Sequence, residues 1–248
     1  MLPIVFCWPF IYLHSLIFAV NGHYLAIGND FLKISYKYKI YLLDCLANFK
    51  FPLWSPAEGG GYPFCTSPYA QAFYPFNIPL AVVYKMLGGY TALDHQIFTV
   101  FGVAIFALGL FAWLRLINCN IRAVIFAALV MSVSFKVTEI LRFPSAVHTA
   151  AWYPWILYGI TRIMFNRSVK NTVLSGILLC FFLICLCTGS YPYNAYYSMF
   201  LVGPYLLAFF IRPLRVRLFG IQPIHWKRAI ITLVIAAFAA GLMCAPYL

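Results

Sequence analysis

The residues of this sequence best suited to chemistry are polar and charged side chains that interrupt long apolar stretches. They occur in three short segments, "GND", "VTEILRFPSAVHTAAWYPW" and "CTGSYPYNAYYSMF", which cover 28–30, 137–155 and 187–200. Ionisable groups within a membrane carry a large solvation cost, so those that are present are functional candidates. The candidates are Asp30, Glu139, Arg142, His148, Tyr191, Tyr193 and Asn194.

The chemistry that suits these residue types is transfer of a group from a lipid-anchored phosphate donor. The carboxylate of Asp30 would act as the general base that takes the proton of an acceptor hydroxyl. Arg142 or a lysine of the same face would neutralise the departing phosphate, which an arginine does through paired hydrogen bonds. The sequence contains no Walker loop, GxSxG, HExxH or GxGxxG motif, so the common nucleotide, serine-hydrolase and zinc-protease chemistries have no support.

Each candidate also has a purely structural alternative. Asp30 precedes an apolar-periodic run and would make a good helix N-cap. Glu139 and Arg142 are three residues apart and would form an ion pair on one helix face. His148 would be a packed core residue, and the tyrosines would belong to an interfacial aromatic belt.

Composition shows which elements must position these residues. The chain is 64% hydrophobic and 9% charged, with a mean hydropathy of +0.88, whereas soluble domains average about 45–50% apolar and about 25% charged residues. A transmembrane helix needs ~20 apolar residues, and several runs approach that length. Strands of the outer-membrane type are not evident, so the fold class expected is an all-α polytopic membrane protein.

Hydropathy predicts about seven transmembrane helices. The predicted spans are residues 3–20, 94–116, 121–136, 146–165, 172–188, 193–211 and 228–246. Residues 76–90 are apolar but short and interrupted, which favours an interfacial or re-entrant helix. Residues 21–93 then form one long first extracytoplasmic loop of a single transmembrane module that covers 1–248.

The distribution of charge supports this topology. The formal net charge is +12, and basic residues collect in cytoplasmic loops, so the charge gives no reason to expect nucleic acid as a partner. Three predicted connections hold basic residues only, and the acids fall on the other side. The basic residues are Arg115, Arg122, Arg162, Arg167, Lys170, Arg212, Arg215, Arg217, Lys227 and Arg228, and the acids are Asp30, Asp44, Glu58, Asp94 and Glu139. We therefore expect an integral protein of the plasma (inner) membrane, with a cytoplasmic N-terminus and an extracytoplasmic active face.

The long loop predicts two surface helices joined by an aromatic segment. In the first, residues 30–49, we expect the lysines to meet lipid headgroups and the apolar residues to dip into the bilayer. The lysines are Lys33, Lys37 and Lys39, and the inward residues are Phe31, Ile34, Tyr38, Tyr41 and Leu42. The aromatic segment would form a rigid lid in which rings stack on a sugar, or it would only seal the bundle. Its substrate-binding candidates are Trp54, Glu58, Tyr62 and Tyr74.

The eight cysteines form no CxxC motif and have no histidine partner at metal-ligand spacing. Most lie in apolar runs, where a thiol behaves as a small hydrophobic group. A disulfide between Cys45 and Cys65 is an open alternative if their loop is extracytoplasmic. A cysteine-ligated metal is not expected.

Several segments resemble a known family. "GND" followed by "PLWSPAEGGGYPF" and "SPYAQAFYPFNIP" resembles the bacterial YfhO-like membrane proteins, which are similar to the GT-C glycosyltransferases. "FPSAVHTAAWYPWILYGITRI" and "TGSYPYNAYY" resemble later segments of the same proteins. The resemblance implies a module of about seven spans with two amphipathic helices in its first outer loop. It also implies polyprenyl-phosphate-linked sugar donors, an acceptor in the cell envelope (polymer, lipid or protein), and Asp30 as the catalytic acid.

The sequence departs from that family in ways that leave alternatives open. Family members are generally longer, so the chain is expected to be the N-terminal part of a longer protein. Asp30 is not followed by a second acid, so no cofactor is assigned and a divalent cation stays open. A transporter or flippase of lipid-linked intermediates, or a non-catalytic assembly subunit of the same fold, are the competing hypotheses. No charge lies near the centre of a predicted span, which argues against the transporter.

Overall fold

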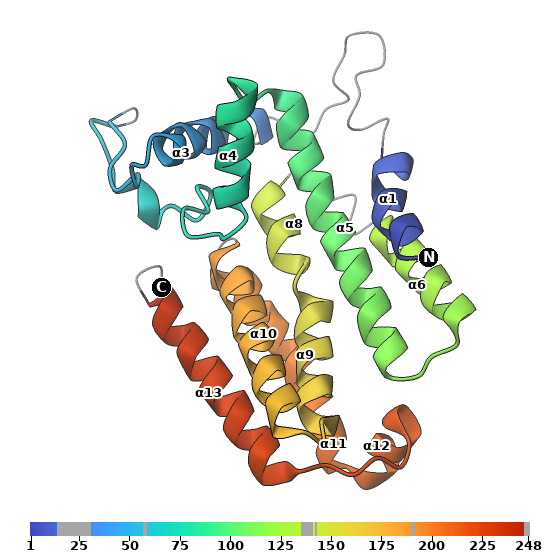
Figure 1. Ribbon diagram of the computed structural model, residues 1–248. Coiled ribbons are helices and arrows are strands. Elements are labelled where there is room, and N and C mark those ends of the chain that lie inside the picture. The colour runs from blue at the N-terminus through green and yellow to red at the C-terminus, as the bar shows by residue number, and fades with distance from the viewer. Residues whose placement is uncertain (14–30, 57–58, 135–140, 142, 190–191, 246–248) are drawn as a thin grey trace.

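The computed structural model describes residues 1–13, 31–56, 59–134, 141, 143–189 and 192–245. Within these ranges every regular element is a helix, and one isolated bridge joins Ser55 to Tyr62 (Figure 1). The helices are α1 (Leu2–Tyr12), the π-helix η1 (Phe31–Tyr36), α3 (Lys37–Ala47), the 3₁₀ turn η2 (Phe64–Thr66), α4 (Asn77–Leu87), α5 (Ala92–Leu116), α6 (Ile121–Ser132), α8 (Pro144–Ala150), α9 (Tyr153–Phe165), α10 (Val169–Thr188), α11 (Pro192–Phe210), α12 (Arg212–Phe219) and α13 (Trp226–Cys244). The predicted all-α fold class is confirmed.

Three helices of the described part are long and apolar enough to cross a membrane. They are α5, α10 and α13, with 25, 20 and 19 residues, against the ~20 that ~30 Å of hydrocarbon requires. A fourth span results if α11 and α12, which are bent by 103° relative to each other, are counted together. These apolar helices indicate a lipid bilayer environment.

Three other predicted spans correspond to shorter helices within the described residues, and positions 14–20 and 135–136 of two of them lie outside those residues. α1 has 11 residues and α6 has 12, and the predicted span 146–165 is divided between α8 and α9. Pro154 explains this division, because a proline ring clashes with the carbonyl four residues earlier, at Ala150, where α8 ends. Within the described residues the structure thus shows three to four candidate spans, and the predicted number of seven is not confirmed.

The predicted outer loop folds into a compact unit, residues 31–90, that we call the cap. Its two helices, α3 and α4, pack against each other beside the first turns of α5 (Figure 1). Leu42 and Phe64 lie in one small apolar core of the cap, and Leu43 and Tyr90 lie in another. The prediction of two helices in this loop is confirmed.

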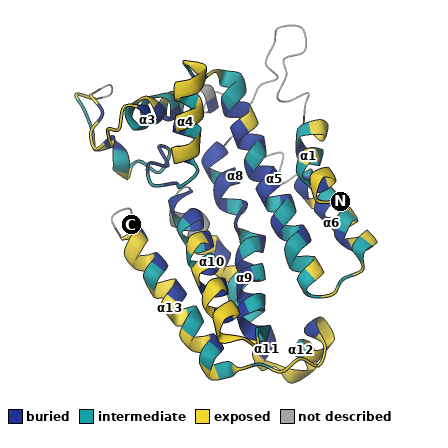
Figure 2. Cartoon of the chain, in the orientation of Figure 1, coloured by how far each residue is buried: buried dark blue, intermediate teal, exposed yellow. Residues whose placement is uncertain are grey.

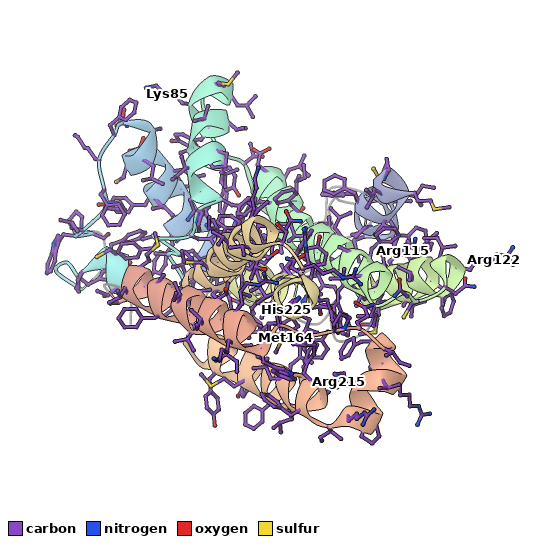
Figure 3. All side chains as sticks on the ribbon, turned by 60° about the horizontal axis from the view of Figure 1, so that its bottom comes forward. Lys85, Arg115, Arg122, Met164, Arg215 and His225 are labelled. Atoms are coloured by element: carbon purple, nitrogen blue, oxygen red, sulfur yellow. The ribbon has the colours of Figure 1, made fainter. Side chains whose placement is uncertain are left out.

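Basic residues gather at the end of the bundle opposite the cap. The α5–α6, α9–α10 and α11–α13 connections lie together at that end (Figure 1). Figure 3 brings this end forward and shows Arg115, Arg122 and Arg215 there, whereas Lys85 lies apart on α4. The three connections that the charge pattern groups together are therefore close in space.

The bundle core is formed mainly by α9 and α10, with contributions from α5, α11 and α13. α13, in contrast, presents an exposed apolar surface at Val234, Ile235 and Phe238 (Figure 2). Monomeric soluble proteins rarely expose contiguous apolar patches this rich. An apolar outer surface around a packed core is what a helix bundle needs in lipid.

The close approach of α5 and α9 at Gly109 leads to a first prediction. A Cβ at this position would lie 2.6 Å from the Trp155 ring, whose Nε1 donates a 2.9 Å hydrogen bond to the carbonyl of Ile105. Gly109→Ala should therefore destabilise the protein by about 1–3 kcal/mol through overpacking. Thermal unfolding in detergent, followed by circular dichroism, measures this effect. Gly203→Ala is the matched control, because nothing lies within 4 Å of its added Cβ, and equal melting of both variants would contradict the prediction.

Candidate functional site

A fully buried lysine lies at the junction of the cap and the bundle. Lys39 is only 1% exposed, and its Nζ donates hydrogen bonds of 2.8 Å to Oε1 of Gln71 and to Oδ1 of Asn77. The same Nζ lies 5.1 Å from the centroid of the Phe98 ring, a cation–π arrangement. The partners among the described residues are therefore two amide oxygens and an aromatic face.

The burial of Lys39 corrects the prediction that all three loop lysines meet lipid headgroups. Lys33 and Lys37 are exposed as expected, but Lys39 is not. Leu42 and Leu43 are buried three and four residues after it, and residues at this spacing share one face of a helix. Lys39 thus belongs to the inward-facing stripe of α3.

Burial lowers the pKa of the Lys39 ammonium from 10.5 to about 7, because the charged form loses its hydration. The group can therefore gain or lose a proton near neutral pH. An anion that approached it would stabilise the ammonium form. Buried cations with displaced pKa values occur frequently at functional sites.

The amide partners of Lys39 also tie the cap to the bundle. Nε2 of Gln71 donates to the carbonyl of Gly189, the residue at the C-cap of α10. Nδ2 of Asn77 donates to the backbone carbonyl of Gln71 at 2.5 Å. The last carbonyls of a helix lack intrahelical donors, so Gln71 satisfies one of them while it holds Lys39.

Two histidine–tyrosine pairs flank the lysine. The Tyr74 hydroxyl lies 3.2 Å from Nδ1 of His148, and the Tyr90 hydroxyl lies 3.1 Å from Nδ1 of His95. The Phe98 ring that faces Lys39 stacks on His148 with centroids 4.2 Å apart. Lys39, His95 and His148 are therefore parts of one buried cluster, which we call the Lys39 cluster.

The Tyr74 hydroxyl also links His148 to Trp152. Nε1 of Trp152 donates to the Tyr74 oxygen at 3.2 Å, and the same oxygen lies within hydrogen-bond distance of Nδ1 of His148. Burial raises the pKa of Tyr74 well above its usual range, which keeps the phenol protonated. Nε2 of His148 and Nε2 of His95 are buried without a hydrogen-bond partner among the described residues.

An apolar groove begins close to the Lys39 cluster. It has a volume of about 630 Å³ and lies between α9, α10, α11 and α13. Its lining includes Ile156, Leu179, Leu186, Tyr196, Val202 and Leu233. Leu186 is one helical turn from Gly189. The carbonyl of Gly189 accepts a hydrogen bond from Nε2 of Gln71, and Oε1 of Gln71 accepts one from Lys39. Two hydrogen bonds therefore connect the groove end to the buried cation.

The structure describes only part of the predicted site. Tyr74 and His148 are brought together, and both are buried, so no ligand reaches the Tyr74 ring in this conformation. Trp54 is 55% exposed and Tyr62 is half-buried, and both belong to the turn of the Ser55–Tyr62 bridge. Asp30, Glu58, Glu139, Arg142 and Tyr191 lie outside the described residues, as do the side chains of Tyr193 and Asn194.

Lys39, Gln71, Asn77 and His95 were not among the sequence candidates. The position of Lys39 on the Leu42–Leu43 face of α3 was a usable signal, because a lysine on an apolar stripe needs a buried partner. The sequence holds no equivalent signal for Gln71 or Asn77, whose roles depend on how the loop folds back onto α3. His95 lies within a predicted span near its outer end, where an ionisable residue is a candidate by default.

The aromatic turn of the cap gives a second prediction. Gly61 has φ +107° and lies against Trp54, whose Nε1 would be 2.5 Å from a Cβ added at Gly61. Gly61→Ala should displace Trp54 and loosen the turn, because residues other than glycine rarely adopt this backbone conformation. Trypsin should then cleave several-fold faster after the exposed Lys50. Gly88→Ala, also at positive φ but with nothing within 4 Å, controls for backbone strain alone, and equal cleavage of the two variants would contradict the prediction.

The arrangement can bind an anion at the Lys39 ammonium and hold an apolar chain in the adjoining groove. Among the described residues, no group of three His, Cys, Asp or Glu side chains is placed to hold a metal ion. Asp30, Glu58 and Glu139 lie outside those residues. Comparison with protein-family models, curated proteins and solved structures gave no match.

Proposed function

We propose that this chain is a membrane glycosyltransferase module that transfers a sugar from a polyprenyl-phosphate-linked donor to a cell-envelope acceptor. The observation that carries the proposal is the buried Lys39 cluster beside the apolar groove. Such a donor has a long apolar chain and an anionic phosphate, and it needs an apolar channel that ends at a cation. The sequence resemblance to YfhO-like proteins and the GT-C enzymes supports the same reaction class.

In this proposal the groove holds the polyprenyl chain. Its lining is almost entirely apolar and it is open along one side, so a lipid could enter laterally from the bilayer. Tyr196 and Ser198 lie among the lining residues and belong to α11. The phosphate would lie beyond the groove end near Gly189, in place of the Gln71 amide that joins Gly189 to Lys39.

The proposed role of Lys39 is to stabilise phosphate charge. The two amide oxygens that accept its hydrogen bonds occupy the positions that phosphate oxygens would take once the cap residues move aside. As the bond between the anomeric carbon and the phosphate oxygen breaks, the leaving phosphate gains negative charge. A cation in a water-poor site stabilises that charge more strongly than one in water.

Asp30 is the proposed general base. It directly precedes Phe31, whose ring lies 4.6 Å from the ring of His95 in the Lys39 cluster. Its carboxylate would take the proton of the acceptor hydroxyl, whose oxygen attacks the anomeric carbon from the face opposite the phosphate. This displacement would invert the configuration of the sugar carbon.

The proposed site faces the extracytoplasmic side of the plasma membrane. The basic connections at the end opposite the cap support this orientation, because Lys and Arg are enriched in cytoplasmic loops. Asp44 and Asp94, the acids in the described residues, lie in α3 and in the first turn of α5, at the cap end. Trp54 and Tyr62 would then be the aromatic residues of the cap turn that contact the sugar.

The test uses the purified chain in detergent with a mixed pool of polyprenyl-phosphate sugars and a cell-envelope extract. Release of free polyprenyl phosphate, followed by mass spectrometry, is the expected result and identifies the donor. Binding of the lipid without any release would overturn the transferase proposal and favour a transporter or a non-catalytic subunit. A cysteine at position 60 labelled by a membrane-impermeant reagent only from the cytoplasmic side would overturn the orientation.

A further inference from the structure

α10 and α13 form a tight parallel seam. Both run toward the cap and lie side by side (Figure 1). A Cβ at Gly176 of α10 would lie 2.6 Å from Cγ2 of Thr232 of α13, so the two helices approach closely at this level. Ala236 and Ala240, one and two turns further along α13, are also small and buried.

Two grooves, one on each side of the contact between α10 and α13, border this seam. The residues that lie between the two groove walls form the seam. The 630 Å³ groove has Leu183 and Cys187 on its α10 wall, and a second groove of about 440 Å³ has Cys180 and Ile184 there. Residues 176, 180, 183 and 187 follow one another at intervals of three or four, which keeps them along one face of α10. In α13, steps of four residues lead from Thr232 through Ala236 and Ala240 to Cys244, and the last three of these residues are buried.

The seam ends in a pair of cysteines. Cys187 is 11 residues beyond Gly176, and Cys244 is 12 residues beyond Thr232, so the register set at the glycine brings both to the same level. The two thiols are close enough to each other to interact. Cys244 is fully buried, and Cys187 is half-buried and lines the larger groove.

We propose that Cys187 and Cys244 form a redox-active pair that closes into a disulfide joining α10 to α13. A disulfide requires Cα atoms about 4.4–6.8 Å apart, and helices in contact through glycine and alanine approach closely enough for short bridges. Cys187 is the thiol that a reagent reaches first, because it lines the open groove, whereas Cys244 is enclosed. This pairing differs from the Cys45–Cys65 alternative, and it does not depend on the proposed transferase activity.

The oxidant of this step is a disulfide-bearing thiol compound or oxidoreductase. The Cys187 thiolate attacks one sulfur of that disulfide, which forms a mixed disulfide and expels one thiolate. The Cys244 thiolate then attacks Sγ of Cys187 and expels the second. Two thiol protons are lost, one S–S bond forms in the protein, and the oxidant is reduced by two electrons to two thiols. The new bond fixes the separation of two helices that form a wall of the larger groove.

The experiment treats the purified full chain in detergent with oxidised glutathione, blocks remaining thiols with N-ethylmaleimide, and digests the protein with chymotrypsin without reductant. The expected result is a linked peptide pair that contains Cys187 and Cys244 and disappears after treatment with dithiothreitol. The proposal would be overturned if Cys187 and Cys244 of the wild-type protein were found in separate peptides, each carrying N-ethylmaleimide or glutathione. This mapping needs no variant, so it does not depend on whether a substituted protein folds.

Two variants sharpen the result. Cys187→Ser should abolish the linked pair and leave Cys244 blocked by N-ethylmaleimide. Cys180→Ser, on the same face of α10 two turns earlier and lining the second groove, is the matched control and should retain the link. Loss of the link in Cys180→Ser, with circular dichroism unchanged, would mean that a different pair of thiols had been joined.

Discussion

The free energy of unfolding of the wild-type protein is expected to rise between about pH 7 and pH 10.5, and replacement of Lys39 by methionine is expected to abolish this rise. In the folded protein, burial lowers the pKa of Lys39 from 10.5 to about 7. Between these two values the unfolded chain binds a proton that the folded chain does not, so the free energy of unfolding increases as the pH rises. Below about pH 7 both states are protonated, and the full cost of burying the charge is present.

The size of this effect sets it apart from other titrations. One pKa unit corresponds to about 1.4 kcal/mol, so the gain across the window is at most about 5 kcal/mol. The measurement is thermal unfolding in detergent at a series of pH values from 6 to 10 for the wild type and for Lys39→Met. Lys37→Met, which removes an exposed lysine from the same helix, corrects for the remaining groups and should keep the wild-type slope.

The slope is the informative quantity, because the substitution also changes absolute stability. Methionine removes the cost of desolvating an ammonium, but it leaves Oε1 of Gln71 and Oδ1 of Asn77 without a donor, which costs ~1–3 kcal/mol for each group. These contributions oppose each other. A slope in Lys39→Met equal to that of the wild type would show that Lys39 is not buried as a titrating group.

Asp30→Asn is expected to reduce sugar transfer by about 10²–10⁴-fold, the usual contribution of general base catalysis. An amide is nearly isosteric with the carboxylate but cannot take the proton of the acceptor hydroxyl. Donor binding should change little, because in the proposal the phosphate is held by Lys39 and the apolar chain by the groove. The measurement is the initial rate of polyprenyl phosphate release at saturating donor.

Asp44→Asn is the matched control for this experiment. Asp44 is an exposed acid on α3, in the same cap, and its substitution changes the net charge by the same amount. Its rate should stay within about twofold of the wild type, since exposed substitutions away from a site have small effects. Equal rates in Asp30→Asn and in the wild type would leave Asp30 with the structural role of a helix N-cap.

The helical fold class and the longest spans could be predicted from hydropathy alone. α5, α10 and α13 are long apolar runs without internal breaks, and their predicted ranges 94–116, 172–188 and 228–246 overlap the observed helices closely. The division of 146–165 was missed, because a hydropathy average does not register that the ring of Pro154 excludes Ala150 from a continuous helix. Of the cap helices, the one in residues 30–49 was predicted from its amphipathic pattern and the one in residues 76–90 from a short, interrupted apolar run, and both are local properties.

The candidate site was less accessible to sequence reasoning, because it depends on contacts between distant segments. Lys39, Gln71 and Asn77 meet across separations of 32 and 38 residues, and Gln71 meets Gly189 across 118. Sequence reasoning selected Tyr74 and His148 for separate reasons, and their mutual hydrogen bond required the folded cap. The expectation for Lys39 was wrong because lysines on a surface helix were all assigned to headgroups, without comparing Lys39 with Leu42 and Leu43.

The most direct test of a phosphate-recognising site at Lys39 is a comparison of two lipids. Equilibrium binding of a polyprenyl phosphate and of the corresponding polyprenol would be measured on the wild type and on Lys39→Met in detergent at pH 7. We predict that the wild type binds the phosphate at least tenfold more tightly, and that Lys39→Met binds both lipids with the affinity that the wild type has for the polyprenol. An undiminished preference for the phosphate in Lys39→Met would contradict the account, because the charge that recognises the donor would then lie elsewhere.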